Sequence, residues 1–267
     1  MAKQFAFEAW LACIEAEQPG VLATILQTES QEPVRMFIPL EDTPIGDLGD
    51  TAVNKQITQI ARQKLHEKKP RSETQTMITA DGEEVSVFID VYMPPIDILI
   101  FGAGHDAIPV ANYCVSLGFR TTVVDARAHY NSEERFPGAI RIIAGEENFR
   151  EQVKISSRTN IIVMNHHLEK DQATLQYVLT SSALYIGALG PRSRCMRMLD
   201  ALQEEGIVFS DCQLGRLYSP VGLNIGADTP EAIAISIVAE IIAINNGQDG
   251  GFLKGSDTIH QRAGATC

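Results

Sequence analysis

The sequence predicts an α/β protein, in which a C-terminal Rossmann-like domain with a doubly wound parallel sheet is preceded by a smaller α/β domain. After residue 94, short apolar strands alternate with helical segments, as in parallel sheets that are covered on both faces. The segment 102–107, Gly-x-Gly-x-x-Ala, follows the first of these strands and opens a helix. Asp125 closes the next strand about 20 residues further on, where a dinucleotide-binding fingerprint expects an acid.

Residues 1–93 are predicted to form the smaller domain. Apolar residues at helical spacing indicate a first helix that ends at Pro19-Gly20. Two strands, a helix and a β-hairpin are expected after it, at 21–26, 34–38, 51–64, and 75–79 with 85–92. The domain boundary is placed at Pro94-Pro95, because proline lacks a ladder donor and restricts the residue before it.

The Rossmann-like domain is predicted to span residues 94–246. Its strands are expected at 96–101, 120–124, 139–143, 161–164 and 184–188. Helices are expected between and after them, at 106–117, 147–153, 172–179, 192–205 and 230–244. The last helix has Thr229 as N-cap and Pro230 in its first turn, and its many apolar residues predict that it is buried. Residues 247–267 form a polar C-terminal tail with little to pack.

Charge and composition exclude several classes of partner. The chain has 22 Lys and Arg against 34 Asp and Glu, a net charge of −12. This sign argues against binding to nucleic acids or anionic membranes, which rely on basic residues. The 5 cysteines are scattered without Cys-x-x-Cys spacing, which favours a reducing compartment over a disulfide framework. A cytoplasmic protein is therefore expected, without a membrane span.

The glycine-rich turn is the first candidate ligand site. Gly102 and Gly104 would let the backbone approach a pyrophosphate at the N-terminus of the following helix. Asp125 would receive a ribose hydroxyl and repel a 2′-phosphate, which favours NAD over NADP. His105 faces either a ligand or solvent. The alternative is that the glycines serve only a tight strand-to-helix turn and that Asp125 caps a loop.

Two later loops are further candidates. In the segment 187–194, backbone amides near Gly187 and Gly190 and the guanidinium groups of Arg192 and Arg194 could meet on one anion. The alternative is that each arginine pairs with a surface carboxylate. The segment 219–230 contains three turn-forming residues whose amides could line a ligand or simply shape a helix entrance: Gly222, Asn224 and Gly226.

His166 stands where a strand ends, at the sheet edge that collects ligands, and could donate a hydrogen bond or move a proton. It could equally be a loop histidine without a function. Cys195 opens a helix near two arginines, which would lower the pKa of an exposed thiol. No metalloprotease, nucleophile-elbow or Walker motif is present.

Four ordered segments together resemble the xanthine dehydrogenase accessory proteins, the XdhC/CoxI family. They are Ile100–His105, Gly118–Arg127, Tyr185–Arg194 and Ser219–Glu231, and the resemblance covers roughly residues 94–244. It implies a homodimer that binds molybdenum cofactor (molybdopterin). It further implies that the protein protects this cofactor while a cysteine desulfurase supplies the terminal sulfur, and passes it to the molybdenum hydroxylase apoenzyme. Arg127, in the second segment, joins the cofactor-binding candidates.

The N-terminal third departs from the family pattern. Where the family has Gly-Ser-x-Pro-Arg, this chain retains Pro33 and Arg35, and the family's Gly-Gly-Cys element has no cysteine here. Of the family's Thr-His-Asp element only His166 is kept. A role for this chain's cysteines in sulfuration is therefore not carried over.

The preferred hypothesis is a binding and insertion factor for molybdenum cofactor, with no catalytic residue and no metal-binding residue of its own. Anionic cofactor would be held by helix N-termini and by Arg192 or Arg194. Two alternatives use the same fold: an NAD(H)-dependent oxidoreductase and a non-catalytic nucleotide-sensing protein.

Overall fold

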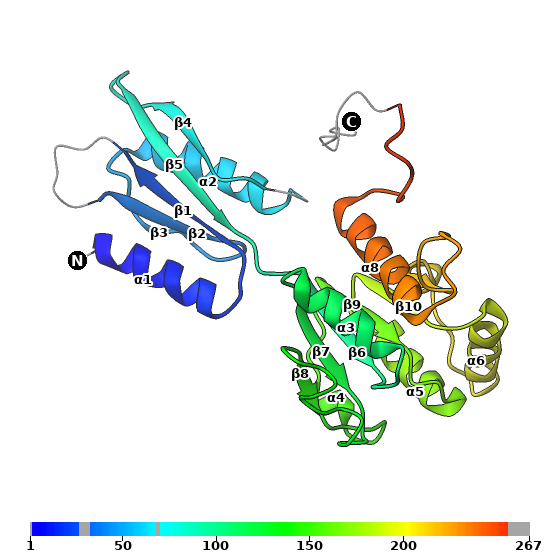
Figure 1. Ribbon diagram of the computed structural model, residues 1–267. Coiled ribbons are helices and arrows are strands. Elements are labelled where there is room, and N and C mark those ends of the chain that lie inside the picture. Colours follow the sequence, from blue (N-terminus) through cyan, green and yellow to red (C-terminus); the bar gives the residue numbers. More distant parts are fainter. Residues whose placement is uncertain (1, 27–32, 68–69, 256–267) are drawn as a thin grey trace. The chain divides into compact units, whose positions relative to one another are not determined.

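The computed structural model describes residues 2–26, 33–67 and 70–255 (Figure 1). The chain divides into two compact units, Met1–Pro94 and Pro95–Cys267. The division falls between the two prolines of the Pro94-Pro95 pair. Of the predicted tail at 247–267, residues 256–267 lie outside the described part, and residues 248–255 form no helix or strand.

The first unit is an antiparallel sheet with two helices. Its sheet has the strand order β3-β2-β1-β5-β4, and every neighbouring pair is antiparallel. The elements in chain order are α1 (Ala2–Glu15), β1 (Gly20–Ile25), β2 (Arg35–Pro39), β3 (Ile45–Gly46), α2 (Thr51–Leu65), β4 (Glu73–Ile78) and β5 (Glu84–Tyr92).

Each face of this sheet packs against one helix. On one face, Trp10 of α1 lies against Phe37 and Tyr92, with ring centroids 5.9 and 6.1 Å away. On the other face, the apolar side of α2 packs on the alternate residues of β1, β2 and β5. Helix α2 begins where the Asp50 side chain accepts a hydrogen bond from the Val53 amide. The helix and hairpin predicted for this region are therefore present.

The second unit is a six-stranded parallel sheet with the order β11-β10-β9-β6-β7-β8. This is the Rossmann order, in which the chain adds strands on one side of β6 and then crosses to its other side. The elements are β6 (Asp97–Phe101), α3 (Ala107–Ser116), β7 (Arg120–Val124), β8 (Ile140–Ile142), α4 (Phe149–Gln152), β9 (Thr159–Val163), α5 (Leu168–Leu179), β10 (Tyr185–Ala188), α6 (Arg192–Glu204), α7 (Asp211–Leu214), β11 (Leu217–Tyr218) and α8 (Pro230–Asn246).

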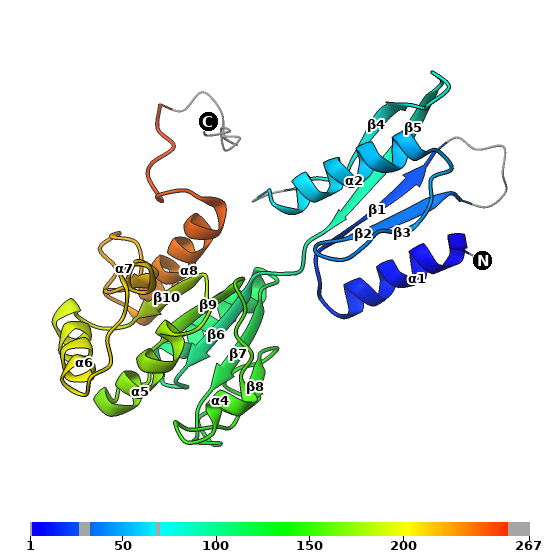
Figure 2. The same cartoon turned by 180° about the vertical axis from the view of Figure 1, so that it is seen from behind.

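Both faces of the central strands are buried, which explains the apolar runs in β6, β9 and β10. In β6, Ile98 and Ile100 face the core shared with α3 and α8, whereas Leu99 and Phe101 face the core shared with α4, α5 and α6. Figures 1 and 2 show the two helical layers from opposite sides. The predicted Rossmann-like fold is confirmed.

Short elements escaped the sequence prediction. Strands β3 and β11 contain two residues each and α7 contains four, too few to show a hydrophobic period. The predicted helix at 147–153 is the single turn α4. In the part of the chain that the structure describes, no helix has the length and apolar character needed to cross a membrane.

A buried polar network joins the last helix to the sheet. The Tyr185 hydroxyl of β10 donates to the Glu240 carboxylate of α8, which also accepts the Gly222 amide at 3.0 Å. Burial and the adjacent carboxylate raise the pKa of Tyr185 well above its usual value. The network therefore fixes the loop before α8 as well as the helix itself.

We expect Tyr185→Phe to lower the free energy of unfolding by about 1–3 kcal/mol, because a buried carboxylate loses a donor. Tyr113→Phe on α3 is the matched control, since its hydroxyl has no hydrogen-bond partner among the described residues, and it should change stability by less than about 0.5 kcal/mol. Urea unfolding of both variants measures the difference. Equal losses would contradict a stabilising role for this network.

Candidate functional site

A pocket of about 290 Å³ opens at the carboxyl edge of the parallel sheet. The end of β6 and the segments after β7, β8 and β9 surround it, and β6 and β9 are the strands at which the order reverses. Ligands of doubly wound proteins bind at this reversal, because the connections that follow the two strands leave the sheet in opposite directions. Apolar residues line part of the wall, with the rings of Phe101 and Phe149 5.2 Å apart.

The glycine-rich turn lies beside this pocket. Gly102 has φ +111°, and a Cβ there would lie 2.5 Å from the Met164 carbonyl oxygen, so the turn requires glycine. A Cβ at Gly104 would lie 3.2 Å from the Cδ2 atom of His166. No described residue accepts a hydrogen bond from the amides of Gly104, His105 or Asp106, which precede α3. The turn therefore retains the donors that an anion would use.

Asp125 is already fully engaged. Its Oδ2 accepts the Ala103 amide at 2.8 Å and Arg127 Nη2 at 2.7 Å, and its Oδ1 accepts the Arg127 amide and Nε, each at 2.9 Å. These four bonds use the acceptor capacity of a carboxylate. The expected bond to a ribose hydroxyl is therefore not supported by its contacts, and Arg127 neutralises the expected repulsion of a phosphate.

His166 occupies a backbone conformation that is uncommon for a non-glycine residue, with φ +59°. Its Nε2 atom lies 3.3 Å from Asp106 Oδ2, so the segment after β9 contacts the start of α3. The side chain is 48% exposed and lines the pocket. His105, by contrast, is exposed and does not line it. Of His105 and His166, the two histidines that lie at or beside the glycine turn, only His166 would therefore contact a ligand in the pocket.

Arg194 does not point to a ligand. Its Nη2 lies 2.6 Å from Oδ2 of Asp171, a buried acid of α5 whose Oδ1 accepts two hydrogen bonds from Asn165. Arg192 is exposed at the start of α6 and does not line the pocket. These contacts give no support to the expectation that both guanidinium groups meet on one anion, and Arg194 has a structural partner that sequence distance concealed.

The glycines of the later loops serve packing. A Cβ at Gly187 would lie 2.4 Å from Val221, and one at Gly222, where φ is +102°, would lie 2.4 Å from Ser236 Oγ. Gly190 also has a positive φ, and a Cβ there would contact Arg194 at 3.5 Å. Asn224 and Gly226 are exposed. None of these residues lines the pocket, so the structure does not bring them together with Arg127 and His166.

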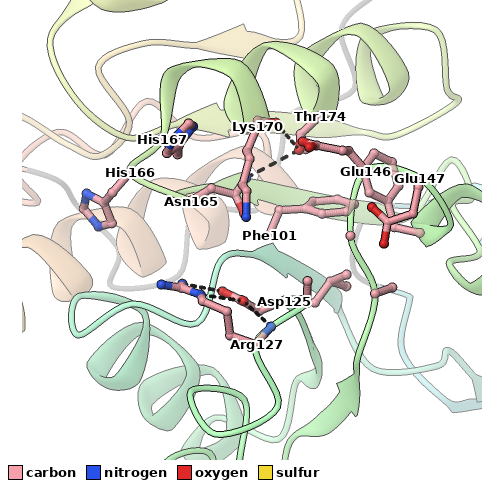
Figure 3. Close-up of a pocket in the computed structure, with 15 residues that line it drawn as sticks. Phe101, Asp125, Arg127, Glu146, Glu147, Asn165, His166, His167, Lys170 and Thr174 are labelled. Carbon is pink, nitrogen blue, oxygen red and sulfur yellow. Dashed lines mark hydrogen bonds and ion pairs between the residues drawn. The ribbon is translucent and has the colours of Figure 1, made fainter.

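The sequence reasoning missed several pocket residues. Lys170 lies in the first turn of α5 and points into the pocket, where Figure 3 also shows Arg127. The segment after β8 contributes Glu146 and Glu147 at the end of the pocket opposite His166 (Figure 3). Helix α5 begins four residues earlier than predicted, and only this earlier start places Lys170 in a first turn at the sheet edge.

None of the four cysteines that the structure describes lines this pocket. Cys195 is buried in the core under α6, and burial raises the pKa of its thiol. Cys114 is buried beneath α3, and burial raises the pKa of its thiol to about 12. Among the residues that the structure describes, no cluster of histidine, cysteine and acidic side chains could hold a metal ion.

The fold and the pocket define a Rossmann-type protein with an open pocket at the carboxyl edge of its parallel sheet. Residues 98–241, more than half of the chain, match the family described as the XdhC Rossmann domain, and the chain belongs to this family. The resemblance seen in the four sequence segments is thereby confirmed.

Three relatives extend this comparison. The uncharacterized protein YqeB of Escherichia coli K12 is 28% identical over 250 residues, 90% of this chain and 46% of YqeB. A probable subunit of xanthine dehydrogenase from Bacillus subtilis 168 is 34% identical over 161 residues, 60% of this chain and 46% of that protein. The molybdenum cofactor insertion chaperone PaoD of E. coli K12 is 22% identical over 178 residues, 67% of this chain and 48% of PaoD. This chain thus spans about half the length of these relatives.

A solved structure, described as a xanthine dehydrogenase from Bacillus halodurans, is also similar. The TM-score is 0.53 at 23% identity, with 91% of this chain and 96% of that chain covered. At this identity the likeness shows the fold alone.

Asp125 gives the site a pH-dependent stability. Burial alone would raise its pKa, but hydrogen bonds from Arg127 and the Ala103 amide outweigh burial and hold the pKa below its usual range. A lowered pKa adds stability above the unfolded value, about 3.9, and this stability is lost as pH falls through the folded value. Asp125→Asn should therefore cost stability at pH 7 and progressively less toward pH 3, in urea unfolding at several pH values. A loss independent of pH would contradict this.

Arg194 and Arg192 should differ in the same experiment at pH 7. Arg194→Ala leaves the buried Asp171 without its cation and should cost about 3 kcal/mol. Arg192→Ala, a matched change at an exposed position of the same helix, should cost less than about 0.5 kcal/mol. The assignment of Arg194 as structural fails if the two losses are alike.

Proposed function

We propose that this chain is an accessory factor that binds molybdenum cofactor and serves xanthine dehydrogenase or a related molybdenum hydroxylase. The observation that carries the proposal is the pocket at the strand reversal, where Arg127, Lys170 and His166 surround an opening in a protein of net charge −12. Family membership and the names of two relatives, a molybdenum cofactor insertion chaperone and a probable subunit of xanthine dehydrogenase, support the choice of ligand and partner.

The residues of the pocket fit the chemistry of this ligand. Molybdopterin combines a pterin ring system with an anionic phosphate. Phe101 and Phe149, which are only 2% and 3% exposed, form the apolar floor beneath the opening, while Arg127 and Lys170 provide partners for an anion. A site lined by apolar rings with a few placed polar groups is the usual design for a small-molecule pocket.

The site is better suited to holding a ligand than to transforming a nicotinamide. Asp125 has no acceptor capacity left for the ribose of NAD. His166 is paired with Asp106 at the start of α3, and its half-exposed side chain lines the pocket. These contacts support a chaperone over an NAD-dependent oxidoreductase.

The proposal includes the finer steps that the family resemblance implies. The protein would act as a homodimer in the cytoplasm and would protect the cofactor while a cysteine desulfurase adds the terminal sulfur. It would then pass the cofactor to the hydroxylase apoenzyme. The arginines at 192 and 194 are no longer the groups we assign to the ligand, because neither lines the pocket.

Protein purified from cells that synthesise molybdopterin should release a pterin on denaturation, identified by mass spectrometry and fluorescence. The same protein from cells blocked in molybdopterin synthesis is the control and should release none. Lys170→Ala should lower the pterin recovered severalfold, because the pocket loses a cation, whereas Arg192→Ala should not. Release of a nicotinamide nucleotide without pterin would reject the proposed function.

A further inference from the structure

The Asp125–Arg127 pair changes what this position of a Rossmann site can recognise. In the fingerprint, an acid at this place accepts the ribose hydroxyls of a dinucleotide. Here all four acceptor positions of the Asp125 carboxylate are filled by the Ala103 amide and by Arg127. Only 6% of the Asp125 side chain is exposed. The pocket therefore meets the guanidinium of Arg127 in place of the acid.

Arg127 is held in one orientation before any ligand arrives. Its Nε and Nη2 bind the two oxygens of Asp125 side by side, and its guanidinium lies 4.3 Å from the centroid of the Tyr130 ring. The side chain is nevertheless 42% exposed and lines the pocket. A guanidinium has five N–H donors, and the two bonds to Asp125 use two of them. The remaining donors are fixed in direction, which lowers the entropic cost of binding an anion.

Lys170 supplies the charge that Arg127 lacks. Because Asp125 neutralises Arg127, this pair has directed donors but little net charge. Lys170 lines the same pocket from α5, and its ammonium has no ion-pair partner among the described residues. Figure 3 shows Lys170 and Arg127 pointing into one opening, with His166 at its side. Glu146 and Glu147 line the opposite end of the pocket, and no ion pair joins either of them to Lys170 among the described residues. Directed donors from one element and a cation from another are the combination that phosphate groups favour.

We propose that this end of the pocket is a receptor for a phosphomonoester, so that the site selects the phosphorylated form of its ligand. The inference rests on the proposed function and adds the ligand class that the site distinguishes. A phosphomonoester carries a charge of about −1.5 to −2 at pH 7 and three strong acceptor oxygens. These oxygens match the outward donors of Arg127 and the ammonium of Lys170. The phosphate belongs either to a pterin or to the 2′ position of a nucleotide.

The test uses pairs of probes that differ only in the phosphate. The full chain is titrated with 6-hydroxymethylpterin and its monophosphate, followed by pterin fluorescence, and with NAD and NADP, followed by calorimetry. We expect the phosphorylated pterin to bind about tenfold more tightly or better than the alcohol, a preference equivalent to one charged contact. Lys170→Ala should reduce this preference severalfold and Lys170→Arg should restore it, while the unphosphorylated probe binds equally to all three proteins.

The choice of variants follows from the partners that each cation has in the structure. Arg127→Gln removes the directed donors, but it also leaves the buried Asp125 without its partner and therefore destabilises the fold. Lys170 makes no ion pair with a described residue, so Lys170→Ala removes a cation from the pocket without breaking such a pair. Lys170→Ala is therefore the decisive variant. Arg192→Ala removes an exposed cation outside the pocket and should leave the phosphate preference unchanged.

The outcomes separate this inference from the function it rests on. Equal binding of the two pterins, unaffected at Lys170, would overturn the phosphate receptor and leave pterin binding intact. Binding of NADP over NAD with no pterin binding would retain the receptor but reject the proposed function. A phosphate preference that persists in Lys170→Ala and disappears in Arg192→Ala would place the receptor elsewhere and overturn the assignment.

Discussion

The reversal of strand order between β6 and β9 is the constraint on which the site depends. These strands are neighbours, but the chain leaves β6 toward β7 and leaves β9 toward β10. No helix can cover the carboxyl edge at this place, because the connections diverge. The glycine turn after β6 and the segment carrying His166 after β9 therefore face each other. Their contact, between His166 and Asp106, lies beside the pocket that His166 lines.

Buried acids position the loops around this opening. Asp125 joins the glycine turn to the segment after β7, Asp171 joins the segment after β9 to α6, and Glu240 joins α8 to the loop that follows β11. Each carboxyl group accepts hydrogen bonds from at least two separate segments. These hydrogen bonds hold in place loops that have no helix or strand of their own. A buried carboxyl group requires hydrogen-bond partners, and Asp125 and Asp171 are each paired with an arginine as well. The same requirement removes these acids from direct ligand binding.

Individual residues in both units fit the positions that this fold gives them. Gly102 stands where the Met164 carbonyl leaves no room for a Cβ, and Asn131 donates to the carbonyls of Val123 and Ile142, where a crossover helix is lacking. In the first unit, Arg35 is one of the residues kept from the family pattern, and its guanidinium lies 4.7 Å from the centroid of the Phe7 ring. The divergent first unit thus retains a regular sheet with a helix on each face.

The sequence by itself determined the alternation of strands and helices, the glycine turn and the position of Asp125, because these depend on local periodicity and backbone sterics. It also identified the family, through four segments in order. Only the tertiary structure decided what fills the Asp125 carboxylate, that Arg194 pairs with Asp171, and that Lys170 and Glu147 reach the pocket. Arg127 lies only two residues from Asp125 in the sequence. The other partners come from separate elements, and they are brought together by the order of the strands and by the residues at which the helices begin. Side chains acquire these partners only when the parallel sheet brings the carboxyl ends of separate strands to one edge.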